Sequence, residues 1–572
     1  MIAGRPLRIM AARLFRRQTF NPENHTVAHS LSSVPSRRRL SRLFAGAAVT
    51  GLLAAVWAAA PDTVLAQGRT ADVLIRGGTI YTGAEQKPIV GNVAISGDKI
   101  VAVGPAASDF TAKRTIDARG MIVAPGFIDA HSHPDTYIRS PDPQSRMNAP
   151  WLFQGSTTVL IGVDGQGTPD VKDEADSFTR QGIGINVVPY VGFGAVRRRV
   201  LHDEARAPTG PELDQEKALV AKGMCEGAVG FSAGLFYAPQ SFAKTEEVIA
   251  IAHEAAIRGG LYDTHQRDES DYTIGLLNSV KEAIDIGREA EMPVHFAHIK
   301  ALGVDVHGMA PDVIKLINQA RATGQDVTAD EYPWLASGSS LSASLVPRWA
   351  VDGGYPAMIK RFNDPEALEK IKTEMRDNLR RRGGPDSMLL TAQDMPWTGK
   401  KLSDMAAEWK VEPVEAAIRV LRQTTNKDGI VSFNMIEGDV QAFMRQPWVV
   451  TSSDGSNGHP RQFASFPEKY AKYVKQLHVI DLQNFIRHST GLTADMFKLD
   501  RRGYLRPGYF ADIVVFDPKT FAPKADYVHP RVLSAGVVDL FVNGQAAIDG
   551  GKLTNVLSGR DLLRTKPARC AL

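Results

Sequence analysis

The chain has only two cysteines, Cys225 and Cys570, among its 572 residues. Two cysteines exclude the disulfide framework of small secreted domains, and they exclude a zinc cluster built from thiolates. Cys225 lies in the segment GMCEGAVGFS, which predicts a buried thiol at a helix end rather than a nucleophile. We therefore expect neither cysteine to contribute to stability or to chemistry.

An excess of basic charge is also missing once the N-terminal segment is set aside. The formal net charge is +4, but residues 1–66 hold nine Lys and Arg residues and only two Asp and Glu residues. The remainder has 58 basic and 61 acidic residues, a net charge of −3. We therefore expect no nucleic-acid partner. A hydrophobic content of 43% with 23% charged residues is typical of a globular protein with a large core.

The N-terminal segment has the features of a targeting sequence. Arg37-Arg38-Arg39 precedes an uncharged run of 18 residues at 43–60, and Val64-Leu65-Ala66 then offers small residues for cleavage before Gln67. The pattern resembles a twin-arginine export signal and predicts a periplasmic or secreted protein. Because 18 uncharged residues are marginally long enough to span a bilayer, attachment to the membrane through an uncleaved signal is the alternative.

Both ends of the remaining chain predict β-structure. From Ala71 to Gly120, short β-branched segments are broken by Gly and Asp, as in strands joined by hairpins. Similar segments return near the C-terminus, for example YFADIVVFD at 509–517. We expect residues 67–125 and 505–560 to pair into one small β-sandwich.

The middle of the chain, residues 126–504, predicts an α/β fold. Apolar strand candidates such as TTVLIG, INVVPYVGF and WVVTSSD alternate with amphipathic helices, which is typical of a parallel (β/α)8 barrel of the TIM type. Residues 341–434 contain extra helical segments where a barrel needs only one strand and one helix. We interpret them as an inserted lid or small subdomain beside the active site.

Four histidines lie at predicted barrel strands: His131 and His133 in GFIDAHSHPD, His265 in YDTHQRDES and His298 in VHFAHIK. His131 and His133 are two residues apart, so on an extended strand both imidazoles face one side, as a shared metal requires. An H-x-H pair alone is a weak signal, but parallel barrels carry their chemistry at the C-terminal ends of strands. A zinc ion with an open coordination position lowers the pKa of water to about 7. The histidines therefore predict a metal-dependent hydrolase.

The order of these and other motifs resembles the amidohydrolase superfamily and, within it, the D-aminoacylase (N-acyl-D-amino-acid deacylase) family. The similarity spans roughly residues 71–564, and the motifs that carry it are HSH, GSTTVLIGVDG, GAVGFSAGLFYAP, YDTHQRDES, MPVHFAHIKALG, DVTADEYPW, SSDG with HPRQFASFPEKY, and GYLRPGYFADIVVFDP. The resemblance implies hydrolysis of the amide bond of N-acyl-amino acids, with the D-series as the expected substrates. It also implies one or two Zn²⁺ ions per chain, with other divalent metals as alternatives.

The resemblance assigns His131 and His133 to a first metal position, with Asp454 beside it as a ligand and as the general acid and base. His265 and His298 are assigned to a second position. An aspartate in S-S-D-G would by itself suggest a turn, but Asp454 follows the buried segment 448–452, which favours the catalytic interpretation.

Asp164 is the clearest departure from the family pattern. In D-aminoacylases a cysteine at the end of the third strand completes the second metal position, and the corresponding residue in GVDG is Asp164. A carboxylate can bridge two cations through separate oxygens, so Asp164 either bridges two metals or, pointing away, leaves one metal held firmly. No lysine occurs in GFSAGLFY, which argues against a carboxylated-lysine bridge.

Three residues are candidates for binding the substrate carboxylate. Lys300 lies two residues beyond His298, while Tyr332 in DEYPW and Arg267 in HQRDES supply further donors. For each the alternative is a structural role, and Arg267 with Glu269 is the candidate for a buried ion pair.

Two other functions stay open at this point. The same site could hydrolyse a cyclic amide, or the amide of a bulky aromatic N-acyl compound, because the inserted segment could reshape the pocket. A non-catalytic barrel that only binds a ligand is the alternative from another class. Against it, all four histidines and Asp454 are present.

Overall fold

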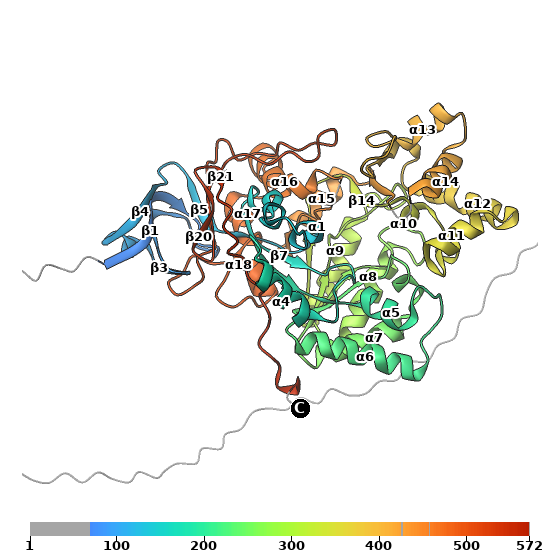
Figure 1. Cartoon of the computed structure of the whole chain (residues 1–572), viewed down its shortest axis with the longest axis horizontal. Coiled ribbons are helices and arrows are strands. Elements are labelled where there is room, and N and C mark those ends of the chain that lie inside the picture. The colour runs from blue at the N-terminus through green and yellow to red at the C-terminus, as the bar shows by residue number, and fades with distance from the viewer. Residues whose placement is uncertain (1–68, 425–426, 457, 571–572) are drawn as a thin grey trace, which may run out of the picture. The chain divides into compact units, whose positions relative to one another are not determined.

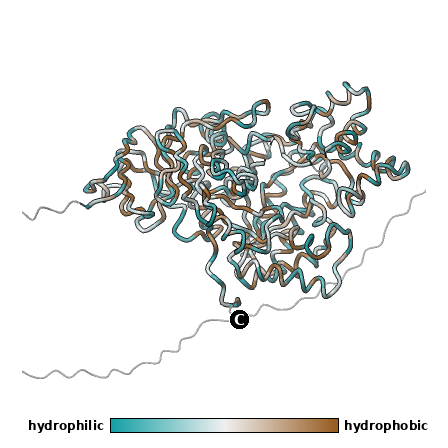
Figure 2. The backbone as a smooth tube through the Cα atoms, in the orientation of Figure 1, coloured by the Kyte–Doolittle hydropathy of each residue, from teal (hydrophilic) through white to brown (hydrophobic). Residues whose placement is uncertain are grey.

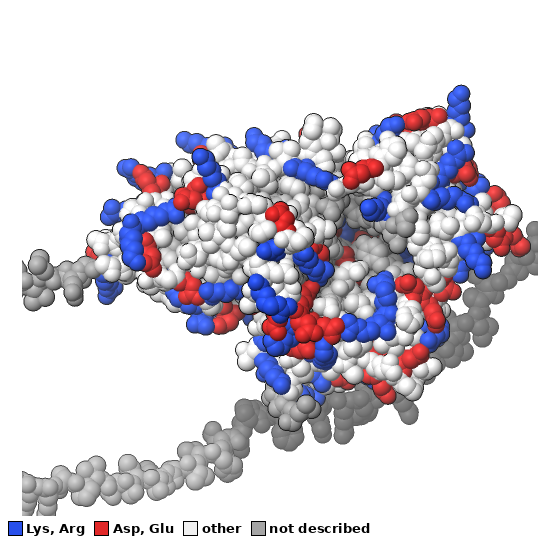
Figure 3. Space-filling model, viewed as in Figure 1, with Lys and Arg blue, Asp and Glu red and all other residues white. Residues whose placement is uncertain are grey.

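A computed structural model describes residues 69–424, 427–456 and 458–570 of the chain. The predicted targeting segment, residues 1–66, lies outside these ranges. Within them, no helix is both long enough and apolar enough to cross a membrane. On the face shown in Figure 3, basic and acidic side chains are interspersed.

Strands from both chain ends form one nine-stranded sheet, in which the N-terminal strands lie beside those near the C-terminus (Figure 1). β18 pairs antiparallel with β5 on one side and with β19 on the other, so it joins the two ends. The predicted β-structure from both termini is thereby confirmed. Its strands are β1 (Arg69–Ile80), β2 (Ile89–Ser96), β3 (Lys99–Gly104), β4 (Phe110–Asp117), β5 (Ile122–Pro125), β18 (Ile513–Phe516), β19 (Val537–Val542), β20 (Gln545–Asp549) and β21 (Lys552–Leu553).

A barrel of parallel strands follows, which confirms the predicted (β/α)8 class. A parallel bridge between Ser132 and Gly455 closes the first strand against the last. Most positions on these strands are buried, as expected where helices cover the outside and side chains fill the inside. In chain order the strands are β6 (Phe127–Asp129), β7 (Ser156–Ile161), β8 (Asn186–Pro189) with its continuation β9 (Val191–Gly192), β10 (Gly230–Gly234), β11 (Leu261–His265), β12 (Val294–Phe296), β13 (Val327–Glu331) and β17 (Val449–Thr451).

Amphipathic helices cover the barrel, and hydrophobic and hydrophilic stretches alternate along the chain in Figure 2. In α8 the buried residues Val280, Ala283, Ile284 and Gly287 recur at helical spacing and form the face toward the strands. The longer helices of this region are α4 (Val171–Gln181), α5 (Phe193–Leu201), α6 (Gly210–Cys225), α7 (Thr245–Ala256), α8 (Leu276–Glu289), α9 (Ala310–Ala322), α15 (Glu437–Met444) and α16 (Arg461–Glu468). Shorter ones are α1 (Asp135–Ile138), α2 (Pro143–Arg146), α3 (Ala149–Leu152), α17 (Leu482–His488) and α18 (Gly491–Met496), and α16 continues into a π-helix, Lys469–Gln476.

Between β13 and β17 the chain leaves the barrel and forms a small sheet with its own helices, yellow and orange in Figure 1. Met375, Trp397 and Leu421 belong to a buried cluster confined to this part of the chain. The segment therefore has its own core, which allows it to hold side chains rigidly beside the barrel. Its elements are β14 (Ser337–Ser340), β15 (Met388–Leu390) and β16 (Gly429–Ser432), with α10 (Leu341–Leu345), α11 (Gly354–Phe362), α12 (Pro365–Arg381), α13 (Leu402–Trp409) and α14 (Pro413–Thr424).

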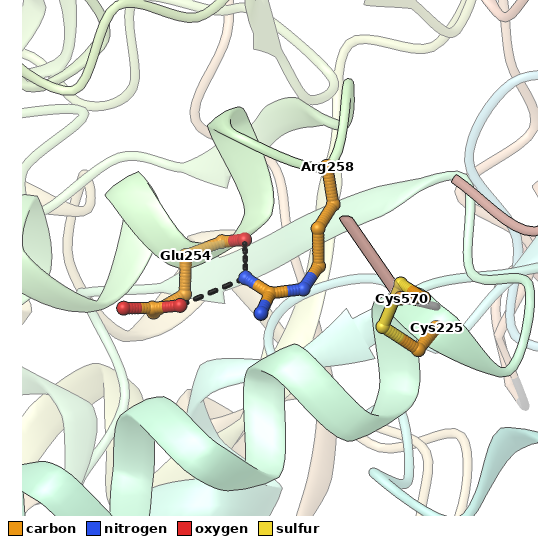
Figure 4. Close-up of a disulfide and its surroundings, with 4 residues drawn as sticks. All are labelled: Cys225, Glu254, Arg258 and Cys570. Atoms are coloured by element: carbon orange, nitrogen blue, oxygen red, sulfur yellow. Dashed lines mark hydrogen bonds and ion pairs between the residues drawn. A yellow bond between two sulfur atoms is a disulfide. The ribbon is translucent and has the colours of Figure 1, made fainter. Parts of the chain in front are cut away.

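The interpretation of Cys225 as a free core thiol is wrong. Cys225, the last residue of α6, forms a disulfide with Cys570, and the two Cα atoms are 5.5 Å apart (Figure 4). The bridge attaches the C-terminal tail to a barrel helix, next to the Arg258–Glu254 ion pair. A separation of 345 residues hides this contact in the sequence, because only the folded tail brings Cys570 to α6.

Candidate metal centre

All six predicted metal ligands meet at the C-terminal ends of the barrel strands. His131 and His133 follow β6, His265 ends β11, and His298 follows β12. Asp454 follows β17, and Asp164 follows β7, which is the second strand of the barrel rather than the third. Within the groups His131–Asp164–His298 and His131–His133–Asp454, the potential ligand atoms lie within 4.8 Å of one another.

Asp164 lies at the centre of this cluster. Its Oδ1 is 3.4 Å from Nε2 of both His131 and His298, and 3.5 Å from Nδ1 of His265. Its Oδ2 is 3.5 Å from Nε2 of His133. The two carboxylate oxygens therefore face different histidines, and Asp164 points into the site.

The buried polar atoms of the cluster fit a divalent cation. Both ring nitrogens of His131, Nε2 of His265 and Oδ1 of Asp164 are buried and have no hydrogen-bond partner in the described part of the chain. Buried polar groups are normally satisfied, so several unsatisfied ones within one cluster of potential ligands indicate a missing ligand. Imidazole nitrogens and carboxylate oxygens are also the donors that zinc accepts.

The pKa shifts within the cluster also favour a bound cation. Burial lowers the pKa of His133, but the hydrogen bonds that it donates to Asp164 and Asp454 outweigh burial and raise the pKa to about 10. Burial acts to raise the pKa of Asp164, yet His131 and the neighbouring histidines hold it well below its usual range. Buried carboxylates that pull positive charge this strongly onto histidine are suited to hold a cation.

Three of the ligand candidates have left-handed backbone conformations. The φ angles are 55° for Asp164, 36° for His298 and 46° for Asp454. Residues other than glycine rarely adopt such angles, and those that do concentrate at functional sites because surrounding structure must maintain them. The backbone thus turns sharply just after each strand and directs these side chains into the site.

Asp129, on β6, connects the two chain segments that carry the predicted ligands of the first metal position. Its carboxylate accepts hydrogen bonds from Nε1 of Trp151 and from the backbone N–H of Ser453, each at 2.8 Å. The backbone N–H of His131 lies 3.4 Å from the same carboxylate. Since Ser453 precedes Asp454, Asp129 links the strand that carries the histidines to the segment that carries the aspartate.

A cavity of about 410 Å³ opens over the cluster. His133, Asp164, His265, His298 and Asp454 line one part of it, and β14 lines another. On the face shown in Figure 3 the surface is hollowed where the inserted segment meets the barrel. The cavity is large enough for a small organic substrate to reach the ligand cluster.

Lys300 and Tyr332 both line this cavity, as their predicted role requires. Nζ of Lys300 is 2.6 Å from Oε1 of Glu269 and 2.6 Å from Nδ1 of His298. The ammonium group lies 5.7 Å from the centre of the Tyr332 ring. Lys300 therefore brings a positive charge next to the predicted metal ligands.

Arg267 does not line the cavity. Its guanidinium binds the carboxylate of Glu282 through Nε and Nη2, at 2.9 to 3.0 Å. Its position does not support the predicted role in substrate binding, and the alternative ion pair with Glu269 is also wrong. Glu269 instead pairs with Lys300.

The sequence reasoning missed Arg461. This residue begins α16, is 1% exposed and lines the cavity. Its Nη1 is 2.7 Å from Oδ2 of Asp454, and its guanidinium lies 4.9 Å from the centre of the Tyr332 ring. The motif HPRQFASFPEKY contains Arg461, but nothing in that motif separates it from an ordinary helix arginine.

Comparison with individual known proteins finds several that are similar in sequence, although no family model matches the chain. It is 31% identical over 528 residues to a D-aminoacylase of Alcaligenes xylosoxydans xylosoxydans, covering 86% of this chain and 98% of that protein. It is 29% identical over 502 residues to an N-acyl-D-glutamate deacylase of the same organism, covering 83% and 93% of the two chains.

Solved structures give the same result. A D-aminoacylase with a binuclear metal centre superimposes with a TM-score of 0.73 at 30% identity, covering 86% of this chain and all of that one. An N-acyl-D-glutamate deacylase from Bordetella bronchiseptica, bound to zinc and a phosphonate that mimics the tetrahedral intermediate, gives a TM-score of 0.72 at 28% identity, with the same coverage.

Proposed function

The chain belongs to the D-aminoacylase family of the amidohydrolase superfamily, and from this premise we propose that it is a zinc-dependent hydrolase of N-acyl-D-amino acids. The main support for this proposal is one structural observation. A cluster of four histidines and two aspartates opens into a cavity that also presents Lys300 and Arg461, and these two cations suit the carboxylate of an amino acid.

The residues of the cluster divide between two metal positions, and the carboxylate of Asp164 faces histidines of both. His131 and His133 would bind a first zinc ion together with Asp454, and His265 and His298 would bind a second. When bound, zinc supplies Lewis acidity that polarises a carbonyl and makes water more acidic.

The remaining steps belong to the side chains of the cavity. Asp454, with Oδ1 3.3 Å from Nε2 of His133, is placed to take a proton from the attacking water and return it to the departing amine nitrogen. Lys300, Tyr332 and Arg461 would hold the substrate carboxylate and so orient the amide bond over the metal position.

The direct test uses purified protein loaded with zinc and a panel of N-acetyl-D- and N-acetyl-L-amino acids. We expect one or two zinc ions per chain by elemental analysis and hydrolysis of the D-series, which chelation removes and added zinc restores. Bound metal without turnover of either series would favour a cyclic or bulky amide. A protein that binds no metal would contradict the proposal.

Export to the periplasm is part of the proposed function. The twin-arginine-like segment before Gln67 supports it, and so does the Cys225–Cys570 bridge, because disulfides persist in oxidising compartments. We expect the periplasmic protein to begin at Gln67 and to carry the bridge. Intact mass after alkylation of free thiols measures both features, and an exported chain with two free thiols, or one that retains residues 1–66, would speak against this part.

A further inference from the structure

The inserted segment places a buried arginine in the substrate cavity. Arg382 caps the C-terminal end of α12, is 2% exposed and lines the cavity above the metal ligands. Its Nη1 donates to Oγ of Ser432 at 3.1 Å, while its Nε has no hydrogen-bond partner in the described ranges. A buried guanidinium with an unused donor is costly unless a ligand completes its contacts.

Tyr272 provides a second unused donor at the same end of the cavity. The guanidinium of Arg382 lies 5.7 Å from the centre of the Tyr272 ring, and both residues line the cavity. The phenolic oxygen of Tyr272 is buried and has no partner among the described residues. A group that accepts hydrogen bonds from both would satisfy them together.

The other cations of the cavity already have carboxylate partners. Lys300 is paired with Glu269, and Arg461 is paired with Asp454. The hydrogen-bond partner of Arg382 is a hydroxyl group, which leaves its charge uncompensated. Arg382 therefore differs from both in having no carboxylate partner among the described residues, so a substrate carboxylate would be its first ion-pair partner.

A second arginine, Arg348, adds to the positive charge at the end of the cavity that Arg382 lines. Arg348 lies beside an adjoining cavity of about 640 Å³ that shares Tyr237 and Ser340 with the first. Its Nη1 donates to the carbonyl oxygen of Ala343 at 2.9 Å, so it too is bound by a neutral group. Burial, together with repulsion from Arg382, lowers the pKa of Arg348 to about 10.

We infer that Arg382, together with Tyr272, binds a second carboxylate of the substrate in addition to the one next to the scissile amide. The inference rests on the proposed function and narrows its substrate class to N-acyl-amino acids with two carboxylates. The second carboxylate comes either from an acidic amino-acid side chain or from a dicarboxylic acyl group. Both sources offer the same anion to the same two donors.

The test compares substrates that differ only in this charge, using the zinc-loaded full chain. N-acetyl-D-glutamate is compared with the neutral isostere N-acetyl-D-glutamine, and N-succinyl-D-methionine with N-acetyl-D-methionine. We expect kcat/KM to favour at least one of the charged members by about 10- to 100-fold, the range for hydrogen bonds to a charged group. The pair that shows the preference identifies the source of the carboxylate.

Variants of Arg382 and Tyr272 test whether these residues cause the preference for the charged substrates. Arg382→Met should remove it, mainly through KM, while kcat/KM for the neutral substrates stays within a few-fold. Tyr272→Phe should reduce it by a smaller factor, and it gives an independent reading if Arg382→Met fails to fold. Arg376→Met is the matched control, because Arg376 lies on the same helix but is exposed and paired with Glu412.

The outcomes separate this inference from the proposed function. Equal kcat/KM for charged and neutral substrates in the wild-type protein would overturn the inference and leave the deacylase proposal intact. A preference that survives in both Arg382→Met and Tyr272→Phe would also overturn it. Absence of turnover with all four substrates would contradict both the deacylase proposal and the inferred site for a second carboxylate.

Discussion

Asp454→Asn is expected to lower kcat by about 10²- to 10⁴-fold, the contribution typical of a general acid and base. Burial acts to raise the pKa of Asp454, but Arg461 and the nearby histidines hold it below its usual range. The carboxylate is therefore ionised, and it remains a weak base that can take up a proton, whereas the isosteric amide of asparagine cannot. Steady-state kinetics on N-acetyl-D-amino acids measure the loss.

Asp454 is also a predicted metal ligand, so the loss must be separated from loss of zinc. Elemental analysis of the same preparation does this, and kcat is compared per metal-loaded chain. Asp135→Asn is the matched control, because Asp135 lines the same cavity but is paired with Arg139 at 3.0 Å. A variant Asp454→Asn with full zinc and kcat within a few-fold of wild type would remove Asp454 from the mechanism.

The sequence predicts the fold because the fold depends on local patterns, and the topology of the barrel then brings the predicted metal ligands to one end. Apolar strand segments that alternate with amphipathic helices define the barrel, and residues that follow parallel strands must converge at one end of it. His131 and His133 are found together for this reason, and so are His265 and His298, although more than 160 residues separate His131 from His298. The topology of the barrel brings them together.

Lys300 lines the cavity and Arg267 does not, although the sequence makes both candidates for binding the substrate carboxylate. Each lies two residues beyond a predicted ligand histidine, and for each the regular strand has already ended. After β12 the backbone turns at His298, with a φ of 36°, and the chain brings Lys300 into the cavity. After β11 it carries Arg267 to Glu282 instead. Residues beyond a strand end are placed by loop conformation, which the strand pattern does not determine.

A different limit of prediction from sequence applies to residues that reach the site from distant segments, namely Arg461, Arg382 and Asp129. Arg461 reaches the site from a helix after the last barrel strand, and Arg382 from the inserted segment. Asp129 acts through hydrogen bonds to Trp151 and Ser453, and Ser453 is 324 residues away in the sequence. The roles of all three arise from tertiary contacts between distant segments, so neither composition nor spacing reveals them.

Asp164→Ala is expected to have the second large effect, a loss of at least one metal position. Oδ1 faces His298 and His131 while Oδ2 faces His133, so one carboxylate is placed to serve both positions. Removing a residue that orients a metal ligand already costs about 10- to 100-fold in affinity, and losing a ligand itself should cost more. Equilibrium dialysis followed by elemental analysis measures the number of zinc ions and their affinity.

Asp164→Cys distinguishes bridging by the carboxylate from simple charge at this position. A thiolate restores a negative ligand, and it is the side chain that the resemblance to D-aminoacylases places here, but it offers one donor atom where aspartate offers two. If Asp164 holds two cations through separate oxygens, Mn²⁺-loaded wild-type protein should give a spin-coupled electron paramagnetic resonance signal, and both variants should weaken the coupling. Asp164→Cys should still bind one ion firmly, whereas Asp164→Ala should not. Two equally tight ions in Asp164→Ala would mean that the histidines and Asp454 suffice, and that the central position of Asp164 has another cause.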